Sequence, residues 1–147
     1  ELCKMFTNLF GLETITLRYF NVYGERQPIR GQYAPVIGLF MRQKAEGKEM
    51  TVVGDGQQRR DFTHVSDVVE ANILSATTDG FKGETFNVGT GTNYNILDIV
   101  KMISGPHTFI APRPAEARVT LADNNKIKDC LKWEHKINLP DWIKENA

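Results

Sequence analysis

The sequence predicts an α/β fold in which at least some neighbouring strands run parallel. Short apolar segments rich in β-branched residues alternate along the chain with segments whose apolar residues recur at helical spacing. Gly, Pro, Asn and Asp separate these segments, as expected for turns. The 147 residues, of which 41% are hydrophobic and 24% charged, suffice for one globular domain with a buried core.

The amino-terminal part of the chain predicts two helices separated by a strand and a polar loop. Residues 2–10 carry apolar side chains at helical spacing, and Gly11 is a natural stop just beyond them. The β-branched residues at 14–19 predict a strand, and residues 25–32 a polar loop. Pro35 is well placed at the first turn of a second helix.

The middle of the chain predicts strands at 50–53 and 60–64, followed by a helix that His64 or Ser66 caps and that runs to about Ala76. Four of its apolar residues are expected to face inward: Val68, Val69, Ile73 and Leu74. Adjacent residues cannot form a nucleophilic triad, so the sequence His64-Val65-Ser66-Asp67 carries no catalytic prediction.

The last part of the chain continues the alternation of strands and helices. The expected elements are a strand at 84–88, a helix capped by Asn95 with Asp98, strands at 108–111 and 119–121, and helices that begin at Asn124 and Leu139. In the second of these helices Ile127, Cys130 and Leu131 should face inward. The turn Gly89-Thr90-Gly91 lacks the third glycine of a dinucleotide-binding loop, because residue 94 is Tyr, and a plain turn is expected.

Composition excludes several classes of function. Because 18 basic residues balance 18 acidic ones, the chain has no global attraction for nucleic acid or an anionic membrane. No apolar run approaches the roughly 20 residues needed to span a bilayer. Cys3 and Cys130 lie far apart and the three histidines are scattered, so we expect reduced thiols, a cytoplasmic protein and no metal site.

The stretch 52–68 is the first candidate for ligand binding. Gly54 and Gly56 allow a tight turn and a close approach of the backbone to a ligand, and two arginines follow. Strand alternation places Arg59 and Arg60 on opposite faces, so that only one can point into a site while the other meets water. The alternative is a plain turn followed by a solvated strand edge.

Arg113 is the second candidate, because the flanking Pro112 and Pro114 hold it in an extended segment. Together with Arg60 it could bind both phosphates of a nucleotide diphosphate from two sides. Glu116 could accept hydrogen bonds from ribose hydroxyls. The alternative is a solvated loop with a surface Arg–Glu pair of little energetic value.

Four motifs occur in the order and approximate spacing of a known family. They are Leu17-Arg18-Tyr19-Phe20-Asn21-Val22-Tyr23-Gly24, Val53-Gly54-Asp55-Gly56 running into Arg60-Asp61-Phe62-Thr63-His64-Val65, Phe86-Asn87-Val88-Gly89, and Pro112-Arg113-Pro114 followed by Ala122-Asp123. With these the chain resembles the NAD-dependent epimerase/dehydratase family. Its members are extended short-chain dehydrogenases/reductases that act on nucleotide sugars and include the UDP-glucose 4-epimerases. The resemblance covers nearly the whole chain.

The resemblance implies a fold and a set of domains. The chain would comprise the last part of a Rossmann-type parallel sheet and the small α/β substrate-binding lobe of such an enzyme. Residues 1–24 would belong to the cofactor domain. The sequence has neither a Gly-x-x-Gly-x-x-Gly loop nor a Tyr-x-x-x-Lys motif. Residues 1–147 are therefore expected to be a carboxyl-terminal substrate-binding portion without the NAD-binding half, inactive alone and without catalytic residues of its own.

The resemblance also implies the roles of single residues. Tyr19 would lie near the nicotinamide of NAD, and Asn21 would bind the diphosphate of the nucleotide sugar. Val36 and Val53 would line the base. Arg60 and Arg113 would bind the phosphates, and Glu116 would bind the ribose.

The resemblance further implies a reaction and a partner. The full-length family transfers hydride transiently between the sugar and NAD, most often for 4-epimerisation of a UDP-hexose. It tends to dimerise through the helix at residues 2–10, so a homodimer is expected. The alternative is a non-catalytic nucleotide-binding or oligomerisation module that retains the same lobe.

Overall fold

The computed structural model describes residues 1–31 and 34–147. Its helices are α1 (Leu2–Phe10), α2 (Val36–Ala45), α3 (Val65–Thr77), α4 (Ile96–Ile103), α5 (Asn125–Leu131) and α6 (Leu139–Asn146). Its strands are β1 (Ile15–Tyr19), β2 (Val22–Tyr23), β3 (Met50–Val53), β4 (Arg59–Asp61), β5 (Thr63–His64), β6 (Glu84–Val88), β7 (Asn93–Asn95) and β8 (His107–Ile110). The expected polar loop at 25–32 is described as far as residue 31, and Gln32 lies outside the described residues.

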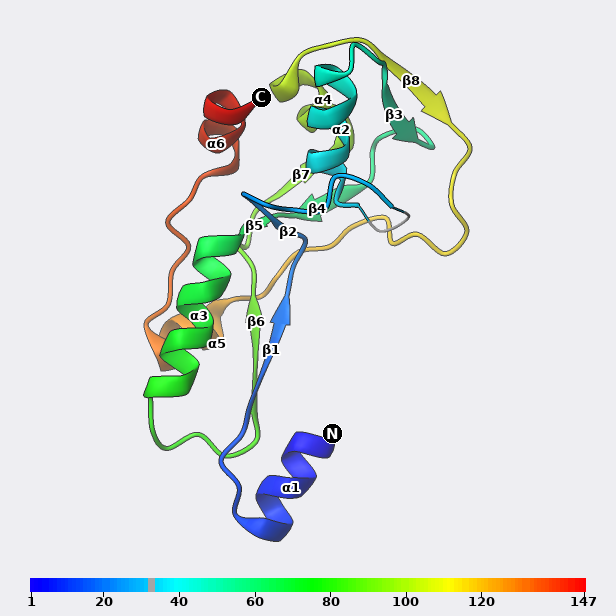
Figure 1. Cartoon of the computed structure of the whole chain (residues 1–147). Helices are drawn as coiled ribbons and strands as arrows, with labels where there is room; N and C mark the ends of the chain where they lie inside the picture. Colours follow the sequence, from blue (N-terminus) through cyan, green and yellow to red (C-terminus); the bar gives the residue numbers. More distant parts are fainter. Residues whose placement is uncertain (32–33) are drawn as a thin grey trace.

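The strands pair two by two, and three of the four pairs are parallel. β1 pairs with β6, β2 with β5 and β3 with β8 in parallel, whereas β4 and β7 are antiparallel. Figure 1 shows β1 and β6 beside α3 and α5 in one part of an elongated molecule, and α2, α4 and α6 gathered with β3 and β8 in the other. The predicted α/β fold with parallel pairing is therefore confirmed.

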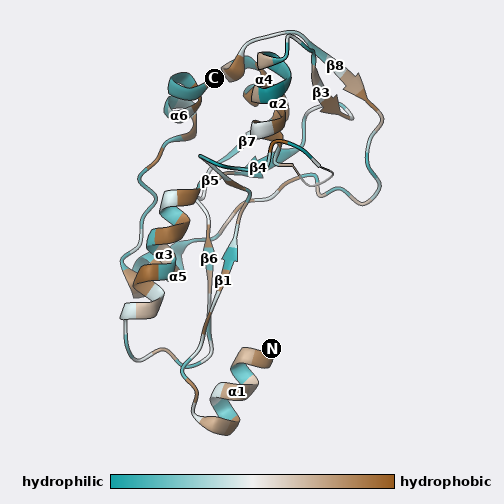
Figure 2. Ribbon diagram, in the orientation of Figure 1, coloured by the Kyte–Doolittle hydropathy of each residue, from teal (hydrophilic) through white to brown (hydrophobic). Residues whose placement is uncertain are grey.

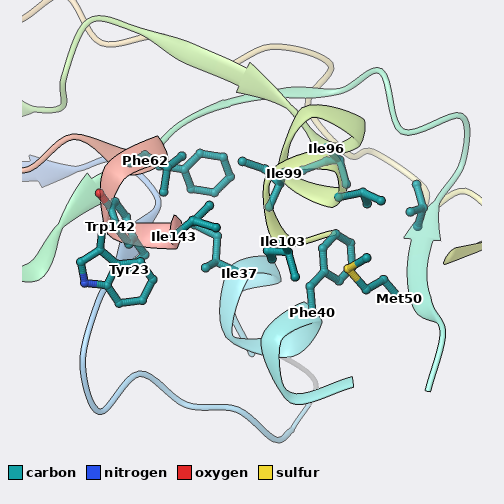
Figure 3. Close-up of a cluster of buried hydrophobic side chains, with 13 residues drawn as sticks. Tyr23, Ile37, Phe40, Met50, Phe62, Ile96, Ile99, Ile103, Trp142 and Ile143 are labelled. Atoms are coloured by element: carbon teal, nitrogen blue, oxygen red, sulfur yellow. The ribbon is translucent and has the colours of Figure 1, made fainter. Parts of the chain in front are cut away.

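The larger hydrophobic core fills the part that contains α2, α4 and α6 (Figure 3). Ile37, Phe40 and Ile99 are fully enclosed there, and α4 begins with the predicted capping box between Asn95 and Asp98. The buried residues of this larger core are Tyr23, Ile37, Phe40, Met50, Val52, Phe62, Ile96, Ile99, Val100, Ile103, Leu139, Trp142 and Ile143. This core joins the helices to β3 and so supports the strand end that precedes the glycine turn.

A second, smaller core lies between α3, α5 and β6. It consists of Val68, Ala71, Phe86, Val88, Ile127, Leu131 and Trp133. The buried Asp67 carboxylate accepts the backbone N–H groups of Lys136 at 2.9 Å and Ile137 at 3.2 Å, while the Trp133 indole donates to the Asp67 carbonyl at 2.9 Å. These contacts tie the segment leading to α6 against α3. Ile15 and Leu17 of β1 pack against the same core. Residues 1–24 therefore share this core with α3, α5 and β6.

Four local predictions are wrong. The strand expected at 119–121 does not form, and Val119 makes only an isolated parallel bridge with Arg59. Val69 and Ile73 are 51% and 57% exposed, because the inward stripe of α3 runs through Val68 and Ala71, three residues apart on one helix face. Cys130 of α5 is likewise exposed. The single strand expected at 60–64 is two short strands with different partners, β4 with β7 and β5 with β2.

Most residues of α1 expose apolar side chains, which Figure 2 shows as brown segments at the end of the molecule. Leu2 and Phe10 are 71% exposed and Leu9 65%. Over residues 1–31 and 34–147, no helix is long and apolar enough to cross a bilayer. In the same part of the chain, no group of three or more His, Cys, Asp or Glu side chains is placed to hold a metal ion.

Candidate functional site

A cavity of about 280 Å³ lies where β3, β4, the start of α2 and the segment after β8 meet. It is lined by Asn21, Ala34, Pro35, Val36, Leu39, Phe40, Thr51, Val53, Gln58, Arg60, Ile96, Arg113 and Glu116. All six residues to which the resemblance assigns substrate binding are on its wall, although they come from segments up to 95 positions apart (Asn21 to Glu116). Their roles toward a ligand stay predictions.

Of the two neighbouring arginines of β4, only Arg60 reaches the cavity. Its side chain is 11% exposed and forms an ion pair with Glu116, with 3.0 Å between Nη2 and Oε1. Arg59 points away, as alternation requires, and donates to the Asn93 side chain at 2.7 Å and the Asn93 carbonyl at 2.8 Å. Arg59 is thus partly buried rather than fully solvated, because Asn93 of β7 binds its guanidinium.

Arg113 is exposed and lines the cavity from the segment at residues 111–118, which we call the strap. An exposed ion pair, with contacts of 2.7 and 2.8 Å, joins Arg118 of the strap to Asp55 in the glycine turn. The Arg118 guanidinium lowers the pKa of the Asp55 carboxyl to about 2 by hydrogen bonding. Together with the pair of Arg60 and Glu116, this contact holds the strap beside the turn.

The two glycines of the turn have different functions. Gly54 lines a neighbouring cavity of about 500 Å³, whose wall shares Arg113 and Glu116 with the first. A Cβ atom on Gly56 would lie 2.7 Å from Leu97 and 2.8 Å from a Val52 methyl group, and its φ is +69°. Gly56 is therefore required by packing, and only Gly54 offers backbone to a ligand.

Asn21 and Tyr19, both at the carboxyl end of β1, lie in different environments. Asn21 lines the first cavity and an adjoining one of about 220 Å³, and its Oδ1 accepts from the Thr120 hydroxyl at 3.3 Å. Tyr19 is outside both cavities. Its side chain is half exposed, and its hydroxyl donates to Asn72 of α3 at 2.9 Å. Its assignment to the nicotinamide stays a prediction.

Sequence reasoning missed the role of Asp61, which is fully buried next to Arg60. Its carboxylate accepts the backbone N–H groups of Thr90 and Gly91 at 2.9 Å and of Ala122 at 3.1 Å. The Thr90 hydroxyl also donates to it at 2.8 Å. The turn at 89–91 is therefore folded around a carboxylate, which takes up the amides of Thr90 and Gly91. An acidic residue inside a strand is the only signal that the sequence contained.

His64 caps α3, as one of the two expected capping residues. Its Nδ1 accepts the Ser66 backbone N–H at 3.2 Å, and its Nε2 lies 3.4 Å from the Glu25 carboxylate. A hydrogen bond from the Trp142 indole lowers the pKa of Glu25. The histidine thus links α3 to the loop after β2 and to α6.

A protein-family model described as the NAD dependent epimerase/dehydratase family matches residues 1–89, more than half of the chain. The chain belongs to this family. A putative UDP-glucose 4-epimerase of Methanocaldococcus jannaschii is 37% identical to it over 150 residues, covering 98% of this chain and 48% of that protein. The UDP-glucose 4-epimerase of Mycolicibacterium smegmatis is 31% identical over 146 residues, covering 95% and 46%.

Solved structures place this epimerase/dehydratase chain in the same fold. The UDP-glucose 4-epimerase of Thermotoga maritima, solved with UDP-glucose, is 35% identical with a TM-score of 0.89, over 97% of this chain and 47% of that one. The UDP-glucuronic acid 4-epimerase of Bacillus cereus, solved with UDP-glucuronic acid and NAD, is 31% identical with a TM-score of 0.88, over 99% and 47%. The chain thus spans about half the length of the relatives it matches.

NAD is the cofactor of the family, but residues 1–31 and 34–147 do not form a complete site for it. The sequence has no Gly-x-x-Gly-x-x-Gly loop. In the turn at 89–91, which follows β6, the amides of Thr90 and Gly91 are bonded to Asp61 and are not free to bind a pyrophosphate. Tyr19, which does not line the substrate cavity and whose hydroxyl is bonded to Asn72 of α3, is the one residue here that the resemblance assigns to NAD.

Proposed function

We propose that this chain binds a nucleotide sugar, a UDP-hexose in particular, and serves as the substrate-binding half of an NAD-dependent 4-epimerase. The observation that carries the proposal is the convergence of Asn21, Arg60, Arg113 and Glu116 on one cavity with an apolar wall. The names of the relatives, UDP-glucose and UDP-glucuronate 4-epimerases among them, support the same substrate class. Location in the cytoplasm stays part of this proposal.

The chemistry of the cavity suits the parts of a nucleotide diphosphate. Val36 and Val53 provide the apolar surface for a flat base. Arg60 donates one N–H group to the Arg59 carbonyl and one to Glu116, and it has five in all, so further donors remain for phosphate oxygens. Glu116 holds the guanidinium in place and offers its other oxygen to a ribose hydroxyl.

Binding through the nucleotide leaves the sugar free to react. In the family, hydride transfer to and from NAD takes place at the sugar, and the groups that carry it out are outside this sequence. What these residues contribute is binding energy at a distance from the reacting carbon, which positions the sugar. Asn21, at the strand end nearest Tyr19, marks the side of the cavity on which the sugar would lie.

Calorimetric titration of the purified chain with UDP and UDP-glucose tests this proposal. Arg60→Ala should weaken binding about 10- to 150-fold, because a hydrogen bond to a charged group contributes about 1.5–3 kcal/mol. Arg113→Ala should lie near the lower end of that range, since Arg113 is exposed. Arg18→Ala removes the same charge from an exposed position of β1 outside the cavity and should leave affinity unchanged.

Two results would contradict the proposal. One is a folded chain that binds neither ligand at millimolar concentration. The other is an equal loss of affinity in Arg18→Ala and Arg60→Ala, which would indicate attraction by charge alone rather than contacts in the cavity.

We further propose that the chain forms a homodimer through α1. The exposed apolar side chains Leu2, Leu9 and Phe10 are the supporting observation, since exposed apolar surface of this kind commonly marks an interface. The same observation favours the alternative of an oligomerisation module. Nucleotide binding in the titration above separates the two, because a module that only assembles has no need of the cavity.

A further inference from the structure

Gln58 lies in the wall that the cavities of about 280 and 500 Å³ share, and neither the family resemblance nor the proposed function assigns it a role. It precedes β4 and is two residues before Arg60, so the two side chains leave the extended chain on the same side, about 7 Å apart along it. The side chain is 7% exposed. A neutral polar side chain so deeply buried beside a cavity requires hydrogen-bond partners.

One of these partners fixes the orientation of the Gln58 amide. Its Nε2 donates to the Val53 carbonyl at 3.1 Å. The opposite orientation would place two acceptor oxygens against each other, so the nitrogen must face Val53. Oε1 accepts no hydrogen bond from the residues that the structure describes, and it is not among the polar atoms sealed in the interior without a partner. The group presented to the cavity is therefore an acceptor in a fixed position.

The other neutral polar side chains of the first cavity are already engaged. The Thr51 hydroxyl accepts from the Gln43 side chain at 3.0 Å, and the Thr51 backbone N–H donates to the same side chain. Asn21 accepts from Thr120 and lies toward the sugar end. Gln58, next to the apolar wall of Val53, is therefore the side chain best placed to meet the edge of a base.

We propose that Gln58 determines base specificity and selects pyrimidines that carry a ring N–H, namely uracil and thymine. Its Oε1 accepts the N3–H of the base, and the second hydrogen on Nε2 is available to an adjacent base carbonyl. In the position assigned to uracil, cytosine would place its N3 lone pair against Oε1, and two acceptors that face each other in a buried site are costly. This inference rests on the proposed function, because it requires that the cavity bind a nucleotide.

Competition between UDP and CDP tests the inference on the full 147-residue chain. The two ligands have the same phosphates and ribose, so their ratio of dissociation constants isolates the base. Wild-type protein should bind UDP about 10- to 100-fold more tightly than CDP. Gln58→Met, which keeps the length of the side chain and removes its polar atoms, should bring that ratio close to one.

Two further variants serve as controls. Gln57→Met makes the same change at the exposed neighbouring residue and should leave the ratio at its wild-type value. Arg60→Ala should weaken UDP and CDP by equal factors and so preserve the ratio, because Arg60 is assigned to the phosphates. Thermal unfolding of each variant measures whether it is folded.

The outcomes separate the inference from the function beneath it. Equal affinity of wild-type protein for UDP and CDP overturns the role of Gln58 without any variant, as does an unchanged ratio in folded Gln58→Met. Absence of binding for both ligands, in a folded wild-type chain, overturns the proposed function instead. A preference for UDP that Gln58→Met abolishes and Gln57→Met retains supports the inference.

Discussion

Asp61→Asn should strongly destabilise the chain, because the Asp61 carboxylate is the buried link between β4, the turn at 89–91 and the segment that enters α5. The side chain is fully buried. One oxygen accepts the Thr90 backbone N–H and hydroxyl at 2.9 and 2.8 Å, and the other accepts the backbone N–H groups of Gly91 and Ala122 at 2.9 and 3.1 Å. Both oxygens are therefore saturated with donors.

An asparagine at this position has one acceptor oxygen and one NH₂ group. If the oxygen stays with Thr90, the N–H groups of Gly91 and Ala122 lose their acceptor and face a donor. A buried donor without a partner costs about 1–3 kcal/mol, so two of them cost about 2–6 kcal/mol. That loss is a large share of the roughly 5–15 kcal/mol by which a folded domain is stable.

Urea denaturation followed by tryptophan fluorescence measures this loss in both parts of the molecule, because Trp142 belongs to the larger core and Trp133 to the smaller one. Asp129→Asn, at an exposed position of α5, is the matched control and should change the unfolding free energy by less than about 0.5 kcal/mol. A loss below about 1 kcal/mol in Asp61→Asn would refute the reasoning, since it would mean that the amide satisfies the same donors.

Three further predictions concern packing, titration and assembly. Gly89→Ala should lower the unfolding free energy by about 1–3 kcal/mol in urea titrations, because its Cβ would lie 2.4 Å from that of Ala122. The Asp55 carboxyl should titrate near pH 2 in an NMR titration, so its ion pair with Arg118 persists at neutral pH and is lost only as the pH falls through about 2. Arg118→Ala should raise the titration midpoint of Asp55 toward about 3.9. Sedimentation should show concentration-dependent association that Leu9→Lys weakens, and a monomer at every concentration would contradict the α1 interface.

Most helices and strands were predictable because their signals are local. Residues 50–53 and 84–88 form strands with the expected bounds, and α1 ends at the expected glycine, whose φ is +68°. The sequence has no local signal for the break in the strand expected at 60–64. The two strands found there, Arg59–Asp61 and Thr63–His64, differ in the strand that pairs with each of them. Pairing with distant residues is the information that a reading along the chain does not contain.

The same distinction explains which parts of the site were predictable. Arg60 and Arg113 were identified because arginine in a glycine-rich or proline-bounded segment is informative by itself. Gln58 and Asp61 were not, because a glutamine and an aspartate at such positions are common on exposed strands. The importance of Gln58 depends on its hydrogen bond to the Val53 carbonyl, and that of Asp61 on backbone amides 29 to 61 positions away.

The charges around the cavity bear on the proposal that a chain with no net charge binds a dianion. Arg60 is nearly buried, and Glu116, at 3.0 Å, compensates the guanidinium that would otherwise be costly to enclose. Arg113 is exposed and adds a second positive charge at the rim without that cost. The nearby Arg118 is neutralised by Asp55. Of the charges named here, one positive charge remains in excess beside the cavity. Under the proposed function, this excess would attract a diphosphate to the cavity that Asn21 and the apolar wall also line.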